Sequence, residues 1–180
     1  MRRAVTIAAA VIVLGASGVG AYQLAPAPTE RPTHWREIAW PFPRDGWPAG
    51  RAFRCEGGCT GAELYVRAKL GFCNCDRGVA DDDEVDRVTD MDLISPRFAA
   101  TAPGVAVRVG ELRGRARSYD LDMPDGARHA ATGFALSRRC DLLVAVAQGA
   151  GEMQAMQRAA LALLETQEMK RWMVAALDGR

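Results

Sequence analysis

The 180-residue chain lacks the short motifs that carry familiar enzyme chemistry. It contains no phosphate-binding P-loop, no H-E-x-x-H zinc motif, no G-x-S-x-G nucleophile elbow and no C-x-x-C-H haem-attachment motif. Histidine is scarce, because only His34 and His129 are present, and each is expected to be a plain surface side chain. The formal net charge of +1 creates no strong field that would attract nucleic acid. These absences predict a protein that is not an enzyme, needs no cofactor and does not bind nucleic acid.

Cysteine, in contrast, is concentrated in one part of the chain. Four of the five cysteines lie within twenty-one residues, at Cys55, Cys59, Cys73 and Cys75, and Cys140 follows far downstream. The cluster could form disulfides, or its four thiolates could hold a soft metal such as zinc or Cu(I), or it could exchange thiols. Its C-x3-C and C-x-C spacings match neither a zinc C-x2-C pair nor a redox C-x-x-C motif.

The N-terminal segment decides between these interpretations, because it sets the redox compartment. Residues 1–22 have a positive start at Arg2 and Arg3, an apolar run over residues 4–14 and then small residues. This layout is typical of a cleaved secretory signal, and its length also suits a single transmembrane anchor. In either case the rest of the chain is expected to lie outside the cytoplasm, where thiols tend to form disulfides.

Disulfides are therefore the favoured interpretation, although their connectivity stays open. Cys73 and Cys75 are two residues apart at the end of an expected strand, so they cannot easily bridge to each other and each needs another partner. We expect the cluster to supply one bridge and Cys140 to join a second, which leaves one odd cysteine. A copper or zinc site formed by Cys55, Cys59, Cys73 and Cys75 remains the alternative.

Residues 23–51 form a segment rich in proline and tryptophan, called the arm below, between the N-terminal segment and a domain over residues 52–180. Its prolines favour an extended backbone. A simple linker would not carry the large aromatic residues Trp35, Trp40, Phe42 and Trp47. The arm therefore either covers apolar surface of the domain or docks to a partner through these four side chains.

The domain shows strand patterns followed by helical patterns. Alternation over residues 64–70 predicts a strand with one buried face, and Asp81 with Glu84 predicts a helix start. Further expected elements are strands near 105–109, 115–121, 129–136 and 142–147, the last one central, and two helices over 151–178 that break at residues 166–167. This order predicts an α+β fold, an antiparallel sheet with C-terminal helices on one face.

Two stretches carry resemblances to known families. The run DLLVAVAQG and the later LLETQEMKRWMVAAL resemble the C-terminal part of the PsbP/Mog1-like superfamily. The block GFCNCDRGVADDDEVDRVTD, with RCDLLVA, is similar to small uncharacterised secreted or membrane-anchored proteobacterial proteins. PsbP-like proteins are mostly accessory or assembly factors of membrane complexes. The resemblance therefore implies a protein on the periplasmic side of the inner membrane, anchored or secreted, that binds a membrane protein complex. Periplasmic thiol or metal handling is the alternative function.

Overall fold

The computed structural model describes residues 32–59, 61–71 and 74–179 of the chain. The N-terminal segment, the first part of the arm and Cys73 lie outside these residues. The elements in chain order are β1 Thr33–Ile38, β2 Arg51–Gly57, β3 Glu63–Lys69, α1 Asp82–Val88, α2 Met91–Ile94, β4 Phe98–Ala100, β5 Val105–Val109, β6 Leu112–Asp122, β7 Arg128–Arg138, β8 Asp141–Gly149, α3 Met153–Leu164 and α4 Gln167–Leu177.

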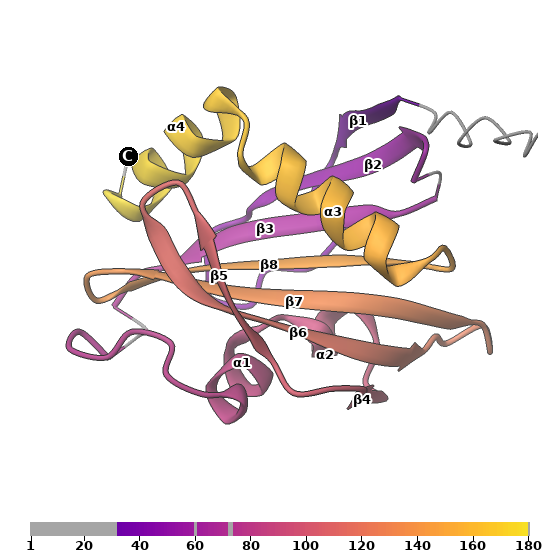
Figure 1. Cartoon of the computed structure of the whole chain (residues 1–180), viewed down its shortest axis with the longest axis horizontal. Coiled ribbons are helices and arrows are strands. Elements are labelled where there is room, and N and C mark those ends of the chain that lie inside the picture. Colours follow the sequence, from indigo (N-terminus) through magenta and orange to yellow (C-terminus); the bar gives the residue numbers. More distant parts are fainter. Residues whose placement is uncertain (1–31, 60, 72–73, 180) are drawn as a thin grey trace, which may run out of the picture.

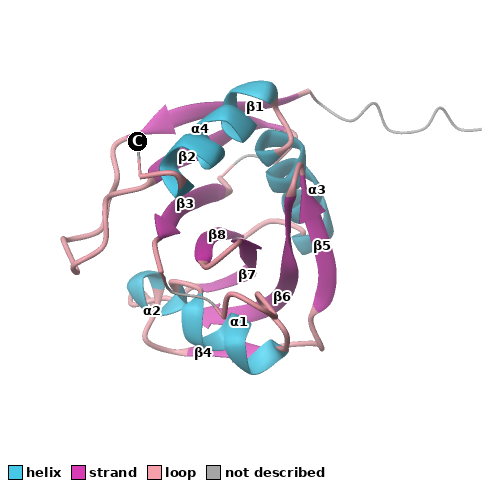
Figure 2. Ribbon diagram, turned by 90° about the vertical axis from the view of Figure 1, so that its left-hand side faces the viewer, coloured by secondary structure: helices cyan, strands magenta, loops and turns pink. Residues whose placement is uncertain are grey.

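The strands form one antiparallel sheet in the order β1-β2-β3-β8-β7-β6-β4, and β5 pairs with β6 on the same side as β4. Helices α3 and α4 cover one face of the sheet, and the short helices α1 and α2 lie on the other face (Figures 1 and 2). The predicted α+β fold with C-terminal helices on one face is thereby confirmed. No helix within the described ranges is long and apolar enough to cross a membrane.

Strand β8 lies near the centre of the sheet and is buried on both faces. Leu143 and Ala145 pack beneath α3 and α4, whereas Val144 and Val146 face the α1 and α2 side. A strand between two apolar layers has no face to reserve for polar residues, which explains its continuous LLVAVA run. The prediction of a central strand here is confirmed.

Strand β3 differs from the prediction of a single buried face. Leu64 and Val66 belong to the core under α3 and α4, as the alternation indicates. The opposite face is covered as well, because Arg67 is only 2% exposed and Lys69 only 6% exposed. The expected solvent face is wrong because these cations have acidic partners supplied by distant segments, described below.

The N-termini of α1 and α4 follow capping signals in the sequence. Asp81 caps α1 by accepting a hydrogen bond from the backbone N–H of Glu84. Thr166 caps α4 in the same way, at the predicted break between the two C-terminal helices. Helix α1 ends at Val88, and Met91 begins the separate helix α2.

Candidate functional site

Two disulfides join four of the five cysteines. Cys55 pairs with Cys59, with Cα atoms 5.6 Å apart, and Cys75 pairs with Cys140, with Cα atoms 4.2 Å apart. The expectation that the cluster supplies one bridge and that Cys140 joins a second is confirmed. The remaining cysteine, Cys73, lies outside the described residues.

The first disulfide closes the turn between β2 and β3. Cys55 is 1% exposed in the main core, and Cys59 is at its margin. The backbone N–H of Cys55 donates to the carbonyl of Ala62 at 2.8 Å, so the turn is also held by hydrogen bonds. Its loop is short, and in the chain-entropy model such a bridge stabilises by about 2 kcal/mol.

The second disulfide joins segments that are far apart in the sequence. It links the loop that follows β3 to the turn between β7 and β8, across a separation of 65 residues. The backbone N–H of Gly71 donates to the Asp141 carboxylate at 2.8 Å, which holds the same two segments together. Closing a loop of this length reduces the entropy of the unfolded chain and stabilises by about 4 kcal/mol.

These bridges change what the cysteine cluster can do. Three of the four thiols expected for the alternative metal site, those of Cys55, Cys59 and Cys75, are part of disulfides. Among the residues that the structure describes, no group of three or more His, Cys, Asp and Glu side chains could hold a metal ion. The cluster therefore holds turns and loops together in this structure.

The arm packs against β3 on the face opposite α3 and α4. The rings of Trp40 and Phe42 both contact the ring of Tyr65 edge-on, with centroids 6.3 Å and 4.8 Å away. Trp40 also lies 5.8 Å from the Arg67 guanidinium, and Trp47 lies 5.9 Å from the Lys69 ammonium. The rings of Trp40, Phe42 and Trp47 are all half-buried, so the arm covers part of its own domain. Two of the β3 side chains that it covers, Arg67 and Lys69, are cations.

An ion-pair network around the buried Arg67 side chain holds the arm in this position. Arg67 donates two hydrogen bonds to Asp45 of the arm, at 2.9 and 2.7 Å, and two to Asp90 between α1 and α2, at 2.6 and 2.7 Å. Lys69 also pairs with Asp90, at 2.7 Å. The hydrogen bonds from Arg67 lower the pKa of the Asp45 carboxyl to about 2. The network thus joins the arm, β3 and the α1–α2 connection.

The fourth aromatic residue of the arm, Trp35, lies elsewhere. It is on edge strand β1, opposite Cys55 of β2, and packs against the core on the α3 side. Its indole Nε1 is buried and has no hydrogen-bond partner among the described residues. The four predicted partner-binding residues therefore do not form one strip, because Trp35 faces the core and the other three lie near the opposite face of β3.

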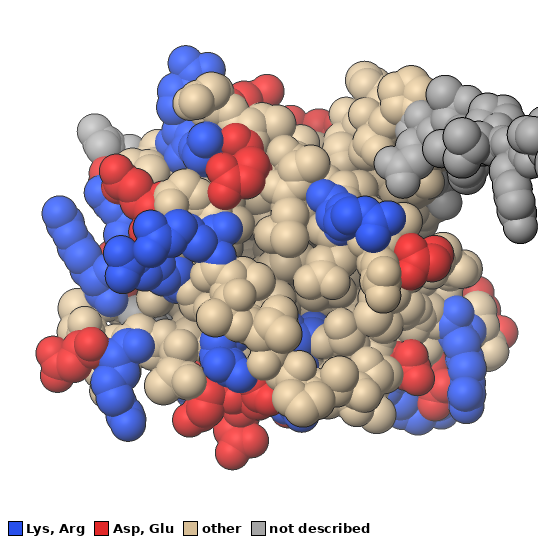
Figure 3. Space-filling model, viewed as in Figure 1, with Lys and Arg blue, Asp and Glu red and all other residues tan. Residues whose placement is uncertain are grey.

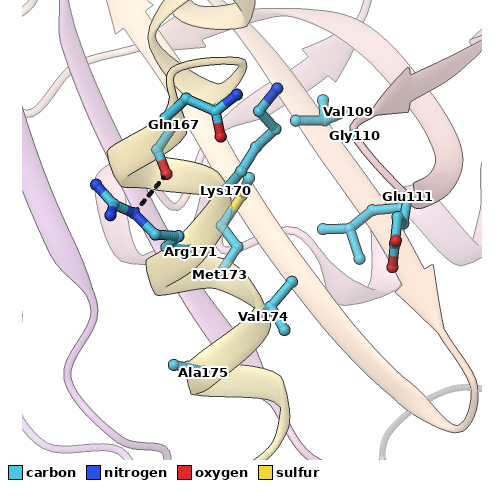
Figure 4. A pocket seen from close by; sticks show the side chains of 10 residues that line it. Val109, Gly110, Glu111, Gln167, Lys170, Arg171, Met173, Val174 and Ala175 are labelled. Carbon is cyan, nitrogen blue, oxygen red and sulfur yellow. Dashed lines mark hydrogen bonds between the residues drawn. The ribbon is translucent and has the colours of Figure 1, made fainter.

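A cleft of about 740 Å³ lies between α4 and the turn joining β5 to β6 (Figure 4). Val109, Leu112 and Val174 form apolar walls, and Lys170 extends across toward the hairpin turn. The Glu165 carboxylate accepts from the Gly110 N–H at 2.9 Å and pairs with Lys170 at 3.4 Å. Lysine and arginine side chains gather over this end of the molecule (Figure 3). No sequence pattern indicates this cleft, because helix and hairpin residues that are distant in the chain form it.

The comparisons with known proteins add little to these observations. No family model matches the chain, and no curated protein matches its sequence. One solved structure that it resembles is that of PA94 from Pseudomonas aeruginosa, a protein of unknown function. The two chains are 14% identical, the match covers 82% of this chain and 83% of that chain, and the TM-score is 0.33. A likeness of this size indicates nothing about the function of this chain.

Proposed function

We propose that this chain is a non-catalytic protein of the bacterial envelope that faces the periplasm and serves as an accessory or assembly subunit of a membrane protein complex. The N-terminal segment would deliver it there, either as a cleaved signal or as a membrane anchor. The domain over residues 52–180 would act by binding, with the arm as part of the contact surface.

The pair of disulfides is the observation that carries this proposal. Bridges such as Cys75–Cys140 persist in oxidising compartments and are rare in the reducing cytosol. They agree with an exported domain, which the apolar run over residues 4–14 also favours. Arg67 with Asp45 and Asp90 forms a structural ion-pair network, which agrees with a binding role.

The arm offers a partner its outer surface. Pro41, Pro43 and Arg44 are exposed, whereas the neighbouring rings point toward β3. Exposed prolines in an extended segment present a surface that is already ordered and loses little entropy on binding. Partner contact at the arm thus needs no rearrangement of the ring cluster beneath it.

Export can be tested with the full chain carrying a C-terminal reporter that folds only outside the cytoplasm. We expect reporter activity, together with an intact mass lower by four protons than that of the fully reduced chain. The same mass shows whether residues 1–21 are present. An inactive reporter, or a chain that carries zinc or copper on free thiols in the native mass spectrum, would contradict the proposal.

Partner binding can be tested by site-specific photo-crosslinking in membranes of the native host. A photoreactive residue at Arg44 samples the outer surface of the arm, and one at Arg158, on α3, is the matched control on the other side of the sheet. We expect a membrane protein to be captured from position 44 and not from position 158. Equal capture from both positions, or none from position 44, refutes docking through the arm.

A further inference from the structure

The two edges of the sheet differ in how they are protected. The β1 edge carries His34, Arg36 and Glu37, and the last two form ion pairs with β2. Charged side chains of this kind discourage a further strand from pairing at an edge. The opposite edge is formed by β4 and β5. Its sequence over residues 96–106, PRFAATAPGVA, contains one charged residue and is exposed except at Gly104, which is half-buried.

Strands β4 and β5 form a single edge interrupted by a bulge. Both pair antiparallel with β6, but the register shifts between Ala100 and Val105, so the intervening residues bulge outward. The bulge is held from inside, because Asp82 of α1 accepts from the Gly104 N–H at 2.9 Å and Arg117 donates to the Ala102 carbonyl at 3.3 Å. The bulge therefore separates the outward backbone groups of β4 from those of β5.

The hydrogen-bond pattern of β4 shows which backbone groups face outward. Arg97 and Thr101 direct their backbone groups inward, since the Arg97 carbonyl accepts from Asp122 and the Thr101 N–H donates to Ser118, both at 2.9 Å. Inward and outward groups alternate along an antiparallel edge. The N–H and C=O groups of Phe98 and Ala100 consequently point away from the sheet, and Phe98 is also among the exposed large apolar side chains.

We propose that this edge pairs with the same edge of a second copy of the chain, across a twofold axis beside Ala99. In that register Phe98 of one copy lies opposite Ala100 of the other, and the outward groups of both residues form four intermolecular backbone hydrogen bonds. Arg97 lies opposite Thr101, so no two like charges face each other. The edge is therefore complementary to itself.

Neighbouring registers fit less well. Moving the axis to Phe98 places Pro96 opposite Ala100. Because proline has no N–H, the Ala100 carbonyl is then left without a donor. Moving it to Ala100 brings Ala102 into the ladder, and the carbonyl of Ala102 already accepts from Arg117. Pairing of this edge with β1 of another copy would leave one unpaired edge at each end and so build an open chain of copies. It would also place this edge beside the charged side chains of β1, whereas the twofold contact forms a closed dimer.

The first test compares Ala100→Pro with Ala100→Thr in the full chain by sedimentation velocity over a range of concentrations. Proline removes the outward N–H that the second copy needs and leaves the pairing with β6 intact, whereas threonine keeps the N–H. We expect the native chain and Ala100→Thr to shift from the mass of one chain to twice that mass as concentration rises, and Ala100→Pro to stay monomeric with an unchanged fold. A native chain that stays monomeric, or an Ala100→Pro variant that dimerises like it, overturns the proposal.

The second test fixes the register. Ala99 would face its own counterpart in a non-hydrogen-bonded pair, where Cα atoms are about 4.5 Å apart and a disulfide can form. In a Cys73→Ser background, Ala99→Cys should give a covalent dimer on mild oxidation. Ala106→Cys, which is also exposed but lies on β5 and is distant from its counterpart, should not form one. Equal crosslinking of the two variants contradicts this twofold contact.

Discussion

The long disulfide should contribute about twice as much to stability as the short one. Cys75–Cys140 closes a loop with a sequence separation of 65, and Cys55–Cys59 closes one with a separation of 4. In the chain-entropy model the loss on opening them is about 4 and about 2 kcal/mol respectively. The difference arises in the unfolded chain, because a longer loop gains more conformational freedom when it is opened.

The experiment uses two variants that each retain one bridge, both in a Cys73→Ser background. One carries Cys55→Ala and Cys59→Ala, and the other carries Cys75→Ala and Cys140→Ala. Urea unfolding is then measured for each variant with and without a thiol reductant. Each variant is compared with itself, before and after reduction of its remaining bridge. The packing change caused by replacing Cys55 in the core is present in both measurements and therefore cancels.

For a domain of this size, the free energy of unfolding falls by about 2 kcal/mol for each molar increase in urea. Reduction should therefore lower the unfolding midpoint by about 2 M in the variant that keeps the long bridge. It should lower the midpoint by about 1 M where the short bridge remains. Equal shifts, or a larger shift for the short bridge, would refute the entropic reasoning. They would show that the local packing of Cys55 and Cys59 sets the stability instead.

Three further substitutions, one of them with a matched control, test the arm, a helix cap and the sheet. Asp45→Asn should lower the free energy of unfolding by about 1 kcal/mol at pH 7 and reduce the loss of stability as the pH falls from 4 to 2. The sign follows because Arg67 lowers the folded pKa of Asp45 from 3.8 to about 2, so this stabilisation is present above pH 4 and is lost on acidification. Asp81→Ala should cost about 1 kcal/mol by removing the cap of α1, and Asp83→Ala, which caps nothing, should cost less than about 0.5 kcal/mol in the same denaturation assay. Gly114→Ala should lower the melting temperature, with a cost of about 1–3 kcal/mol, because its Cβ would collide with the backbone of β7.

The parts of the fold that sequence could predict are those set by local patterns. The capping pair at Asp81, the break at Thr166 and the continuous apolar run of β8 each depend on neighbouring residues, and all three are confirmed. The pairing of Cys140 with a member of the cluster was also predictable, because Cys73 and Cys75 are too close along a strand to bridge each other. Which of the two would pair was not, since that depends on where the β7–β8 turn lies.

The parts that sequence could not predict are those set by distant partners. Arg67 and Lys69 alternate with apolar residues, a pattern typical of a solvated strand face. They are buried because Asp45 and Asp90, each more than twenty residues away, supply the compensating charges. The bulge between β4 and β5 was equally hidden, because it depends on contacts from α1 and β6.

The ion pair between the buried Arg67 and the partly exposed Asp45 also limits how the arm can serve a partner. Lifting the arm would expose the rings of Trp40 and Phe42 and would break the hydrogen bonds at 2.9 and 2.7 Å that hold Asp45. Losing the Asp45 pair costs about 1 kcal/mol, because its carboxylate is partly exposed and Arg67 keeps its bonds to Asp90. Exposing the rings adds to this cost, so a partner that required a detached arm would lose binding energy. Contact with the exposed prolines requires no such rearrangement. The arm is therefore expected to act as a fixed surface, and substitutions of its rings should lower stability before they alter recognition.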